Sequence, residues 1–169
     1  MAPGTCAATE EKTKAFLKLV NTETVLEDSS QFIPSEKFRE GEIGDGVRIL
    51  HVDLNFKQHY FNKFEGRVRP ATLRIWKLEE EAFTDWILNR LDCSAEIMLG
   101  QFWKLLTTQR TRSGGCLREK TTSAFIRDEH NVVFPVRARW YPNEKGFEIG
   151  ILLPPYFFKW PKEREFVSR

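Results

Sequence analysis

Residues 132–153 read VVFPVRARWYPNEKGFEIGILL, and this stretch decides the fold class. Apolar and polar side chains alternate over 132–141 and again over 147–153, which is typical of strands that bury one face. The sequence PNEKG between them carries the proline, asparagine and glycine that tight turns prefer. Together with TTSAFIR at 121–127, the stretch predicts a meander of three antiparallel strands.

The alternation separates a buried face from an outward face in this meander. Arg137, Arg139 and Tyr141 are expected to point outward, where Glu148 can pair with one of the arginines. Pro135 cannot donate a backbone hydrogen bond, which favours an edge strand or a bulge. The expected inward side chains are Phe134, Val136, Ala138 and Trp140, followed by Phe147, Ile149, Ile151 and Leu153.

Three shorter strands are expected upstream of the meander, at 31–34, 47–56 and 71–77. In the longest of them, VRILHVDLNF, apolar residues alternate with polar ones as far as Phe56. Between the first two strands, SEKFRE predicts one helical turn that Gly41 ends. The polar segments 21–30 and 57–70 are expected to be loops or irregular connections.

A central helical pair is predicted at 78–91 and 95–106. In the first helix, acids occupy the first turn and Arg90 the last, as the helix dipole favours. Because strands do not alternate regularly with helices, a doubly wound parallel sheet is not expected, and we predict an α+β fold with a mainly antiparallel sheet. The apolar stripe of the first helix comprises Leu78, Ala82, Phe83, Trp86, Ile87 and Leu91.

Length and composition indicate a single domain. The chain has 169 residues, of which 41% are hydrophobic, so it can bury a substantial core. Residues 1–8 are expected to be a flexible N-terminus, and 9–169 a single globular domain. Three widely spaced cysteines favour reduced thiols over a disulfide framework or a zinc site. Without an apolar run of membrane-span length, we expect a cytoplasmic or otherwise intracellular protein with no membrane contact.

Charge is distributed unevenly along the chain. Residues 1–56 hold six Lys/Arg and ten Asp/Glu, a net charge of −4, whereas 57–169 carry +6. The segments 57–70 and 107–122 combine cations with aromatic, hydroxyl or glycine residues. Cations of this kind neutralise phosphates, while Asn, His and Arg also read base edges, so two arms could clamp a duplex. The expected nucleic-acid-binding residues are Lys57, His59, Asn62, Lys63, Arg67, Arg69, Arg110, Arg112 and Lys120.

No complete catalytic constellation appears in the sequence. It contains no P-loop, dinucleotide fingerprint or nucleophile elbow, and we expect no cofactor. His51 and Asp53 share one face of a predicted strand and could both reach one ligand. A restriction-type magnesium site needs Glu-x-Lys, but Gly150 follows Glu148 at the lysine position. These patterns indicate a binding protein rather than an enzyme, without catalytic or metal-binding residues.

Three segments carry a resemblance to a known family: AFLKLVNTETVL at 15–26, QFIPSEKF at 31–38 and GVRILHVDLNF at 46–56. They resemble the opening of the DNA-binding pseudobarrel found in plant transcription factors and in recognition or effector domains of restriction endonucleases. The resemblance implies an open pseudobarrel that binds double-stranded DNA. It also implies two arms that enter the major groove, which by position would be residues around 21–30 and 57–69.

Three functions follow as hypotheses. The first is duplex DNA binding through two basic arms, as in a restriction-related recognition module, and it predicts salt-sensitive binding that weakens without Arg67 and Arg69. The second is a small inhibitor or adaptor encoded by a mobile element, which binds a protein partner through the aromatic tail YFFKW at 156–160. The third is a magnesium-dependent nuclease that uses Asp53, Glu65 or Glu148.

Overall fold

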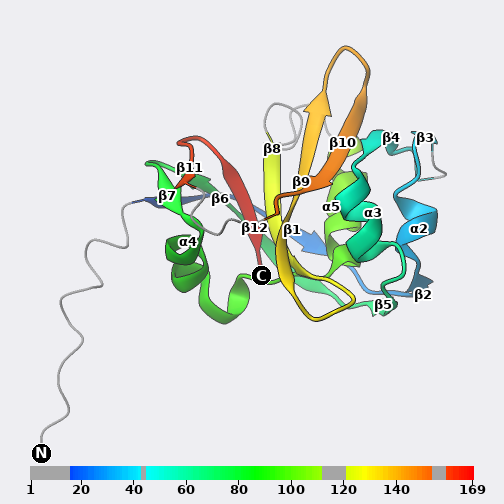
Figure 1. Cartoon of the computed structure of the whole chain (residues 1–169), viewed down its shortest axis with the longest axis horizontal. Coiled ribbons are helices and arrows are strands. Elements are labelled where there is room, and N and C mark those ends of the chain that lie inside the picture. The colour runs from blue at the N-terminus through cyan, green and yellow to red at the C-terminus, as the bar shows by residue number, and fades with distance from the viewer. Residues whose placement is uncertain (1–15, 43–44, 112–120, 154–158) are drawn as a thin grey trace, which may run out of the picture.

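The computed structural model describes residues 16–42, 45–111, 121–153 and 159–169. A mixed, mostly antiparallel sheet forms its centre, which confirms the predicted α+β class (Figure 1). The strands of this sheet are β1 (Leu17–Val25), β3 (Gly41–Glu42), β4 (Arg48–Val52), β6 (Ala71–Leu78), β8 (Thr121–Arg127), β9 (Val133–Tyr141), β10 (Gly146–Ile151) and β12 (Glu165–Ser168). They run in the order β1-β6-β12-β8-β9-β10-β4-β3, and with β1 and β3 as its two edges the sheet stays open.

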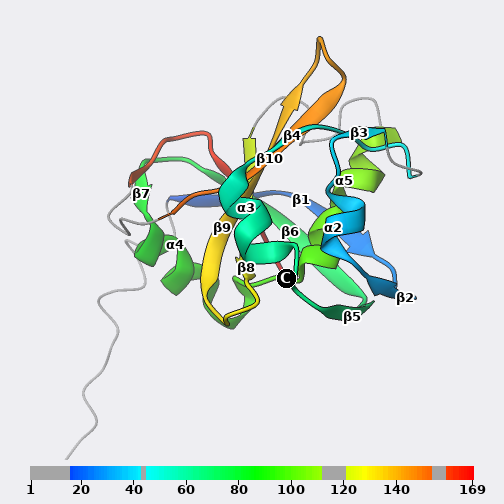
Figure 2. The same ribbon diagram turned by 45° about the vertical axis from the view of Figure 1, so that its right-hand side comes forward.

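Two small sheets and several helices surround the main sheet. The strands β2 (Asp28–Phe32) and β5 (Glu65–Val68) pair with each other, as do β7 (Ala82–Phe83) and β11 (Lys159–Trp160). The helices are α2 (Pro34–Lys37), α3 (Leu54–Tyr60), α4 (Thr84–Leu91) and α5 (Leu99–Thr111), with a 3-10 turn η1 (Asp92–Ser94). Figure 2 shows α2, α3 and α5 grouped together, while α4 lies at the other end beside β7. Among the helices described, none is long and apolar enough to cross a membrane.

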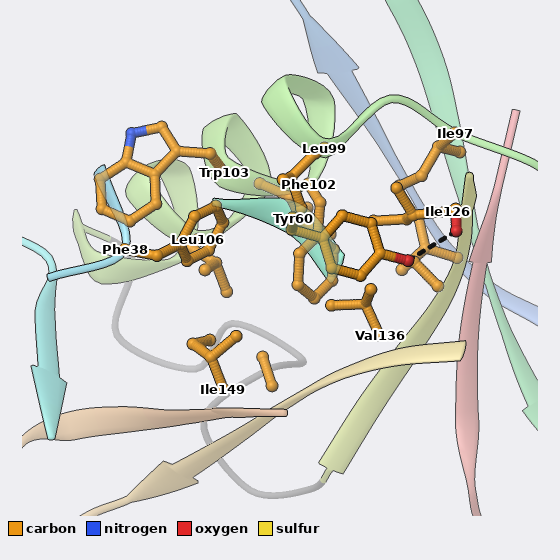
Figure 3. Close-up of a cluster of buried hydrophobic side chains, with 14 of the residues drawn as sticks. Phe38, Tyr60, Ile97, Leu99, Phe102, Trp103, Leu106, Ile126, Val136 and Ile149 are labelled. Carbon is orange, nitrogen blue, oxygen red and sulfur yellow. Dashed lines mark hydrogen bonds between the residues drawn. The ribbon is translucent and has the colours of Figure 1, made fainter. Parts of the chain in front are cut away.

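The main sheet buries side chains on both faces. On one face, aromatic rings from α3, from α5 (among them Trp103) and from Phe38 directly after α2 pack over Val136 and Ile149 (Figure 3). Neighbouring residues on a strand point to opposite faces, and Phe125 accordingly belongs to a second cluster on the other face, together with α4 and β11. This second cluster covers only part of its face, which leaves room for polar side chains over β9 and β10.

The predicted meander is present as β8, β9 and β10, with antiparallel pairing throughout. Six of the eight expected inward side chains are buried, whereas Trp140 is half-buried and Leu153 is exposed because β10 ends at Ile151. The prediction of an edge or bulge at Pro135 was wrong, because β9 lies between β8 and β10. The backbone carbonyl of Pro135 accepts a hydrogen bond from the N–H of Leu152, one residue beyond the last paired residue of β10. In an antiparallel pair the nitrogen and the carbonyl of a residue point to the same side, so the nitrogen of Pro135 faces a position where the pairing of β9 with β10 has ended.

The strand predicted at 47–56 ends early, because β4 stops at Val52. Asp53 caps α3 through its carboxylate, which accepts a hydrogen bond from the backbone N–H of Phe56. Phe56 is therefore buried as a helical residue, and Leu54 is exposed. The segment 57–70, expected to be irregular, forms most of α3 followed by β5.

The helical pair was predicted with wrong starting points. Leu78 belongs to β6 and the first helix begins only at Thr84, so Trp86 is half exposed rather than part of a buried stripe. The second helix, α5, begins at Leu99 and continues to Thr111. Its start is fixed by tertiary contacts described below, which local sequence patterns do not contain.

Two further elements were not predicted as strands. The polar segment 21–30, expected to be a loop, belongs largely to β1 and β2. Residues 165–168, for which no element was predicted, form β12 in the middle of the sheet, between β6 and β8. The helical turn expected within SEKFRE is present as α2, with Pro34 at its first position. The predicted end at Gly41 was wrong, because α2 ends at Lys37 and Gly41 begins β3. The N-terminal segment 1–8, expected to be flexible, lies outside the described residues.

Candidate nucleic-acid interface

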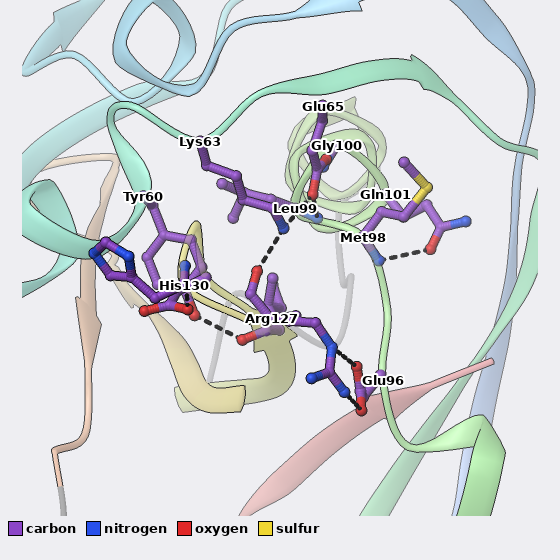
Figure 4. Close-up of polar contacts among 12 residues, drawn as sticks. Tyr60, Lys63, Glu65, Glu96, Met98, Leu99, Gly100, Gln101, Arg127 and His130 are labelled. Carbon is purple, nitrogen blue, oxygen red and sulfur yellow. Dashed lines mark hydrogen bonds and ion pairs between the residues drawn. The ribbon is translucent and has the colours of Figure 1, made fainter. Parts of the chain in front are cut away.

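The basic segment 57–70 uses one of its lysines inside the fold. Lys63 lies 2.6 Å from the carboxylate of Glu65, whose side chain is only 5% exposed. The same carboxylate accepts from the backbone N–H groups of Leu99 at 2.9 Å and Gly100 at 2.8 Å, at the start of α5 (Figure 4). Glu65 thus satisfies the unpaired donors of the helix start and compensates the charge of Lys63.

His59 connects α3 to the turn between β8 and β9. Its Nδ1 lies 2.9 Å from the buried carboxylate of Asp128, and its ring packs against Phe134. Burial alone would raise the pKa of Asp128, but hydrogen bonds from His59 and from the backbone N–H groups of Val132 and His130 lower it overall. The histidine therefore has a structural role, although its side chain remains 27% exposed.

Two more cations of this segment lie beside carboxylates. Lys57 is 3.4 Å from Glu40, and Arg67 is 3.1 Å from Glu27, both in exposed pairs. Asn62 and Arg69 are exposed, and within the described part of the chain their side chains make no hydrogen bond or ion pair. Most of the positive charge expected to face phosphates is therefore compensated by acids of the chain itself.

The two arms implied by the pseudobarrel resemblance meet in space. Strand β2 pairs with β5, so that Gln31 lies opposite Arg67. Asp28 of the first segment also pairs with Lys104 of α5 at 2.6 Å. Of the acids of 21–30, Glu27 thus neutralises Arg67 of the other arm, whereas Asp28 neutralises a lysine of α5.

The second basic segment begins within α5. Arg110 belongs to the last turn of this helix, with its side chain outside the description, and Arg112 and Lys120 lie outside the described residues. Gln101, at the other end of α5, donates to the backbone carbonyl of Arg69 at 3.0 Å. Gln101 and Arg110 are nine residues apart in α5. At a rise of 1.5 Å per residue, Arg110 therefore lies about 14 Å along the helix axis from the contact with Arg69.

A different group of cations gathers on the outward face of β9. Arg137 and Arg139 lie two residues apart on this strand, and Arg164 approaches them from the turn between β11 and β12. Burial, and after it the like charges of Arg137 and Arg139, lower the pKa of Arg164. An arginine nevertheless stays charged at neutral pH, so these three residues, here called the arginine face, concentrate positive charge.

Aromatic rings orient two members of the arginine face. The guanidinium of Arg139 lies 4.9 Å from the centroid of the Tyr141 ring, and that of Arg164 lies 5.7 Å from the Trp160 ring. Such stacking leaves the edges of a guanidinium, which carry its hydrogen-bond donors, directed away from the ring.

The floor beside Arg137 is formed by small residues on the neighbouring strands. Ser123 of β8 and Gly150 of β10 are its cross-strand partners. A Cβ atom at Gly150 would lie 2.2 Å from Oδ2 of Asp53 and 3.1 Å from Nε of Arg137, so only glycine fits there. Among the residues described, the buried Oγ of Ser123 and the buried Nε of Arg137 find no hydrogen-bond partner, which is unusual inside a fold.

Two carboxylates lie near the three arginines. Glu148 is 3.2 Å from Arg137 and accepts from the hydroxyl of Tyr141 at 2.8 Å, a hydrogen bond that raises the pKa of the tyrosine. Asp53 uses its oxygens for the backbone N–H groups of Phe56 and Ile151. Three guanidinium groups thus face two carboxylates, and the patch keeps a positive charge.

The sequence contained part of the signal for this site. The alternation over 132–141 correctly placed Arg137, Arg139 and Tyr141 outward, and the expected pairing of Glu148 with an arginine is confirmed. These arginines were not among the expected binding residues, because a strand arginine opposite an acid was interpreted as a pair. No local pattern indicated that Arg164 would join them.

The residues considered for a nuclease have separate roles. Asp53 caps α3, Glu65 caps α5 and Glu148 pairs with Arg137, while His51 is exposed with its Nδ1 3.4 Å from Glu40. Within the residues described, no three His, Cys, Asp or Glu side chains gather as a possible metal site.

The aromatic tail considered as a partner surface is described only at its end. Trp160 is buried and donates from its indole N–H to the hydroxyl of Thr84, so its ring belongs to the core. The preceding residues 156–158 lie outside the described part of the chain.

Comparisons with protein-family models, with curated proteins and with solved structures found no match to this chain.

Proposed function

We propose that this protein binds nucleic acid, with duplex DNA as the preferred target, through the arginine face rather than through the two basic arms. One observation carries the proposal: Arg137 and Arg139 of β9 and Arg164 of a distant turn lie close enough for their charges to interact, and the two carboxylates nearby leave one positive charge in excess. A protein that holds like charges together gains from an anionic partner that relieves their repulsion.

The chemistry of the patch suits phosphate groups. Guanidinium donors match two phosphate oxygens at once, and rings that stack on Arg139 and Arg164 leave these donors accessible. Thr121 lies opposite Arg139 on β8 and adds a hydroxyl of the kind that contacts a nucleic-acid backbone. Phosphate contacts of this type supply affinity and salt dependence without selecting a base sequence.

The proposal is tested by fluorescence anisotropy with a labelled duplex of about 20 base pairs across a salt series from about 50 to 200 mM. Each neutralised phosphate contributes about −0.9 to the slope of log K against log salt, so three arginines give a slope of about −2.7. The double variant Arg139→Gln/Arg164→Gln should reduce the steepness by about 1.8. Arg90→Gln, on the exposed end of α4, serves as the control and should leave the slope unchanged.

A parallel pair of variants separates the arginine face from the arms. Arg67→Gln/Arg69→Gln removes the same amount of charge, but Arg67 is already paired with Glu27, so we expect a smaller effect than from the arginine-face variant. Equal binding by wild type and the Arg139→Gln/Arg164→Gln variant would contradict the proposed interface. Undetectable duplex binding at the lowest salt concentration would contradict the function itself.

A further inference from the structure

A pocket of about 450 Å³ lies beside the hairpin of β9 and β10. Figures 1 and 2 show this hairpin projecting beyond the rest of the main sheet. The pocket lies on the strand face opposite to the arginine face, because Trp140 and Arg139 are neighbours on β9 and point in opposite directions. Its lining residues are Gly46, Val47, Arg48, Trp140, Pro142, Lys145 and Phe147.

The apolar walls come from the hairpin. Trp140 and Phe147 are cross-strand partners, with ring centroids 4.8 Å apart and planes tilted by 59°. Pro142, in the turn that follows β9, adds a third rigid apolar surface. Flat rings and a proline of this kind accept a planar ligand by stacking at a small cost in side-chain entropy.

The other wall comes from the start of β4, and a glycine allows its close approach. A Cβ atom at Gly146 would lie 2.6 Å from Cγ of Leu50 and 3.1 Å from the carbonyl oxygen of Arg48. Because residue 146 is glycine, β4 can lie tightly against the hairpin at the end next to its turn. The pocket is therefore a consequence of how the backbone packs, and its walls are held by two strands.

Two cationic side chains, Arg48 and Lys145, line the pocket. Arg48 donates to the carbonyl oxygen of Glu144 at 3.1 Å, which holds its guanidinium near the turn, and Lys145 occupies this turn with a φ of 52°. Neither side chain makes an ion pair with any residue of the described part of the chain. The pocket thus combines an aromatic wall with two positive charges that form no ion pair among the side chains the structure describes.

We infer that this pocket binds a nucleotide, with the base against Trp140 and Pro142 and the phosphate between Arg48 and Lys145. Its volume falls within the usual range for small-molecule sites, about 300 to 1,000 Å³. Base stacking on an aromatic ring is tolerant of sequence and is strengthened by nearby cations. The ligand is either a free mononucleotide or an unpaired nucleotide of a strand, and neither depends on the arginine face.

The test compares adenosine with AMP by isothermal titration calorimetry on the full chain. AMP should bind at least five-fold more tightly than adenosine. Lys145→Asn removes one charge while the new residue tolerates positive φ, so it should bring AMP close to adenosine and leave adenosine unchanged. Trp140→Leu should weaken both ligands at least five-fold. Lys162→Asn, in the turn between β11 and β12, is the matched control and should change neither.

A short single-stranded oligonucleotide distinguishes the two sources of ligand. Stronger competition by the oligonucleotide than by AMP assigns the pocket to an unpaired nucleotide, and weaker competition assigns it to the free compound.

AMP that fails to bind at about 10 mM, or binds equally to wild type and Lys145→Asn, would overturn the inference. If Trp140→Leu does not fold, the comparison of AMP with adenosine in Lys145→Asn still decides. The Arg139→Gln/Arg164→Gln variant should bind AMP as wild type does, so failure of one site leaves the other testable.

Discussion

Replacement of Glu65 by alanine should destabilise the protein more than any other single loss of an acid described above. The carboxylate accepts two backbone hydrogen bonds, from Leu99 and Gly100, and lies 2.6 Å from Lys63, while its side chain is 5% exposed. Hydrogen bonds to a charged group contribute about 1.5–3 kcal/mol each, and removal of one partner of a buried ion pair costs about 3–5 kcal/mol. Because these contributions overlap, we expect a loss of about 3–4 kcal/mol.

Urea denaturation measures this loss directly. With a slope of about 2 kcal/mol per molar urea, the midpoint should fall by about 1.5–2 M. Glu65→Gln keeps one acceptor oxygen and should cost about half as much. Glu80→Ala, in the exposed turn after β6, is the control and should remain within about 0.5 kcal/mol of wild type. A midpoint shift below about 0.5 M for Glu65→Ala would refute the view that this carboxylate holds the start of α5.

Two further changes test the packing and the electrostatics of the fold. Gly150→Ala should lower the melting temperature by about 4–8 °C, because the new Cβ would lie 2.2 Å from Oδ2 of Asp53, a clash that costs about 2 kcal/mol. Gly66→Ala is the control in the same thermal scan. Nothing lies within 4 Å of a Cβ at Gly66, so this variant should melt at the wild-type temperature. Hydrogen bonds from Lys104 and Ser30 hold the pKa of Asp28 well below its usual range. The stability from this charge is complete above the ordinary pKa of about 4 and is lost as the pH falls toward the lower folded value. The urea midpoint of Asp28→Asn should therefore fall less between pH 6 and pH 3 than that of wild type, and parallel curves would contradict this assignment.

The fold was predictable wherever the pattern of side chains repeats along one strand. Alternation over 132–153 gave the meander, its turns and most of its buried residues, because each strand has a fully buried face on one side. The pattern failed at Phe56, where an apolar residue at the right spacing belongs to a helix that Asp53 caps. A capping aspartate inside an alternating run fits both interpretations, and only the contact with Ile151 of β10 decides between them.

The C-terminal strand was not predictable for a related reason. Residues 165–168 are only four residues long and include a glutamate and a serine, yet β12 is buried between β6 and β8. Its polar side chains find partners from distant segments: Ser168 accepts from the indole of Trp76, and Thr122 donates to Glu165. A strand whose polar groups are satisfied by distant residues has no local signature.

The sequence also does not show which cations of the candidate interface are paired with acids from distant segments. Whether a cation is available to a ligand depends on the acids near it, and for Arg67 and His59 these are Glu27 and Asp128, which lie 40 and 69 residues away in the sequence. Counting cations along a segment therefore does not reveal which of them are paired within the fold. At Arg137 one neighbouring acid was visible in the sequence, but the approach of Arg164 was not. The guanidinium of Arg137 lies beside one carboxylate, that of Glu148, and near two further arginines. A phosphate that replaces Glu148 as its partner would therefore also reduce the repulsion among the three arginines. At Arg67, a phosphate would only exchange the exposed ion pair with Glu27 for another exposed ion pair.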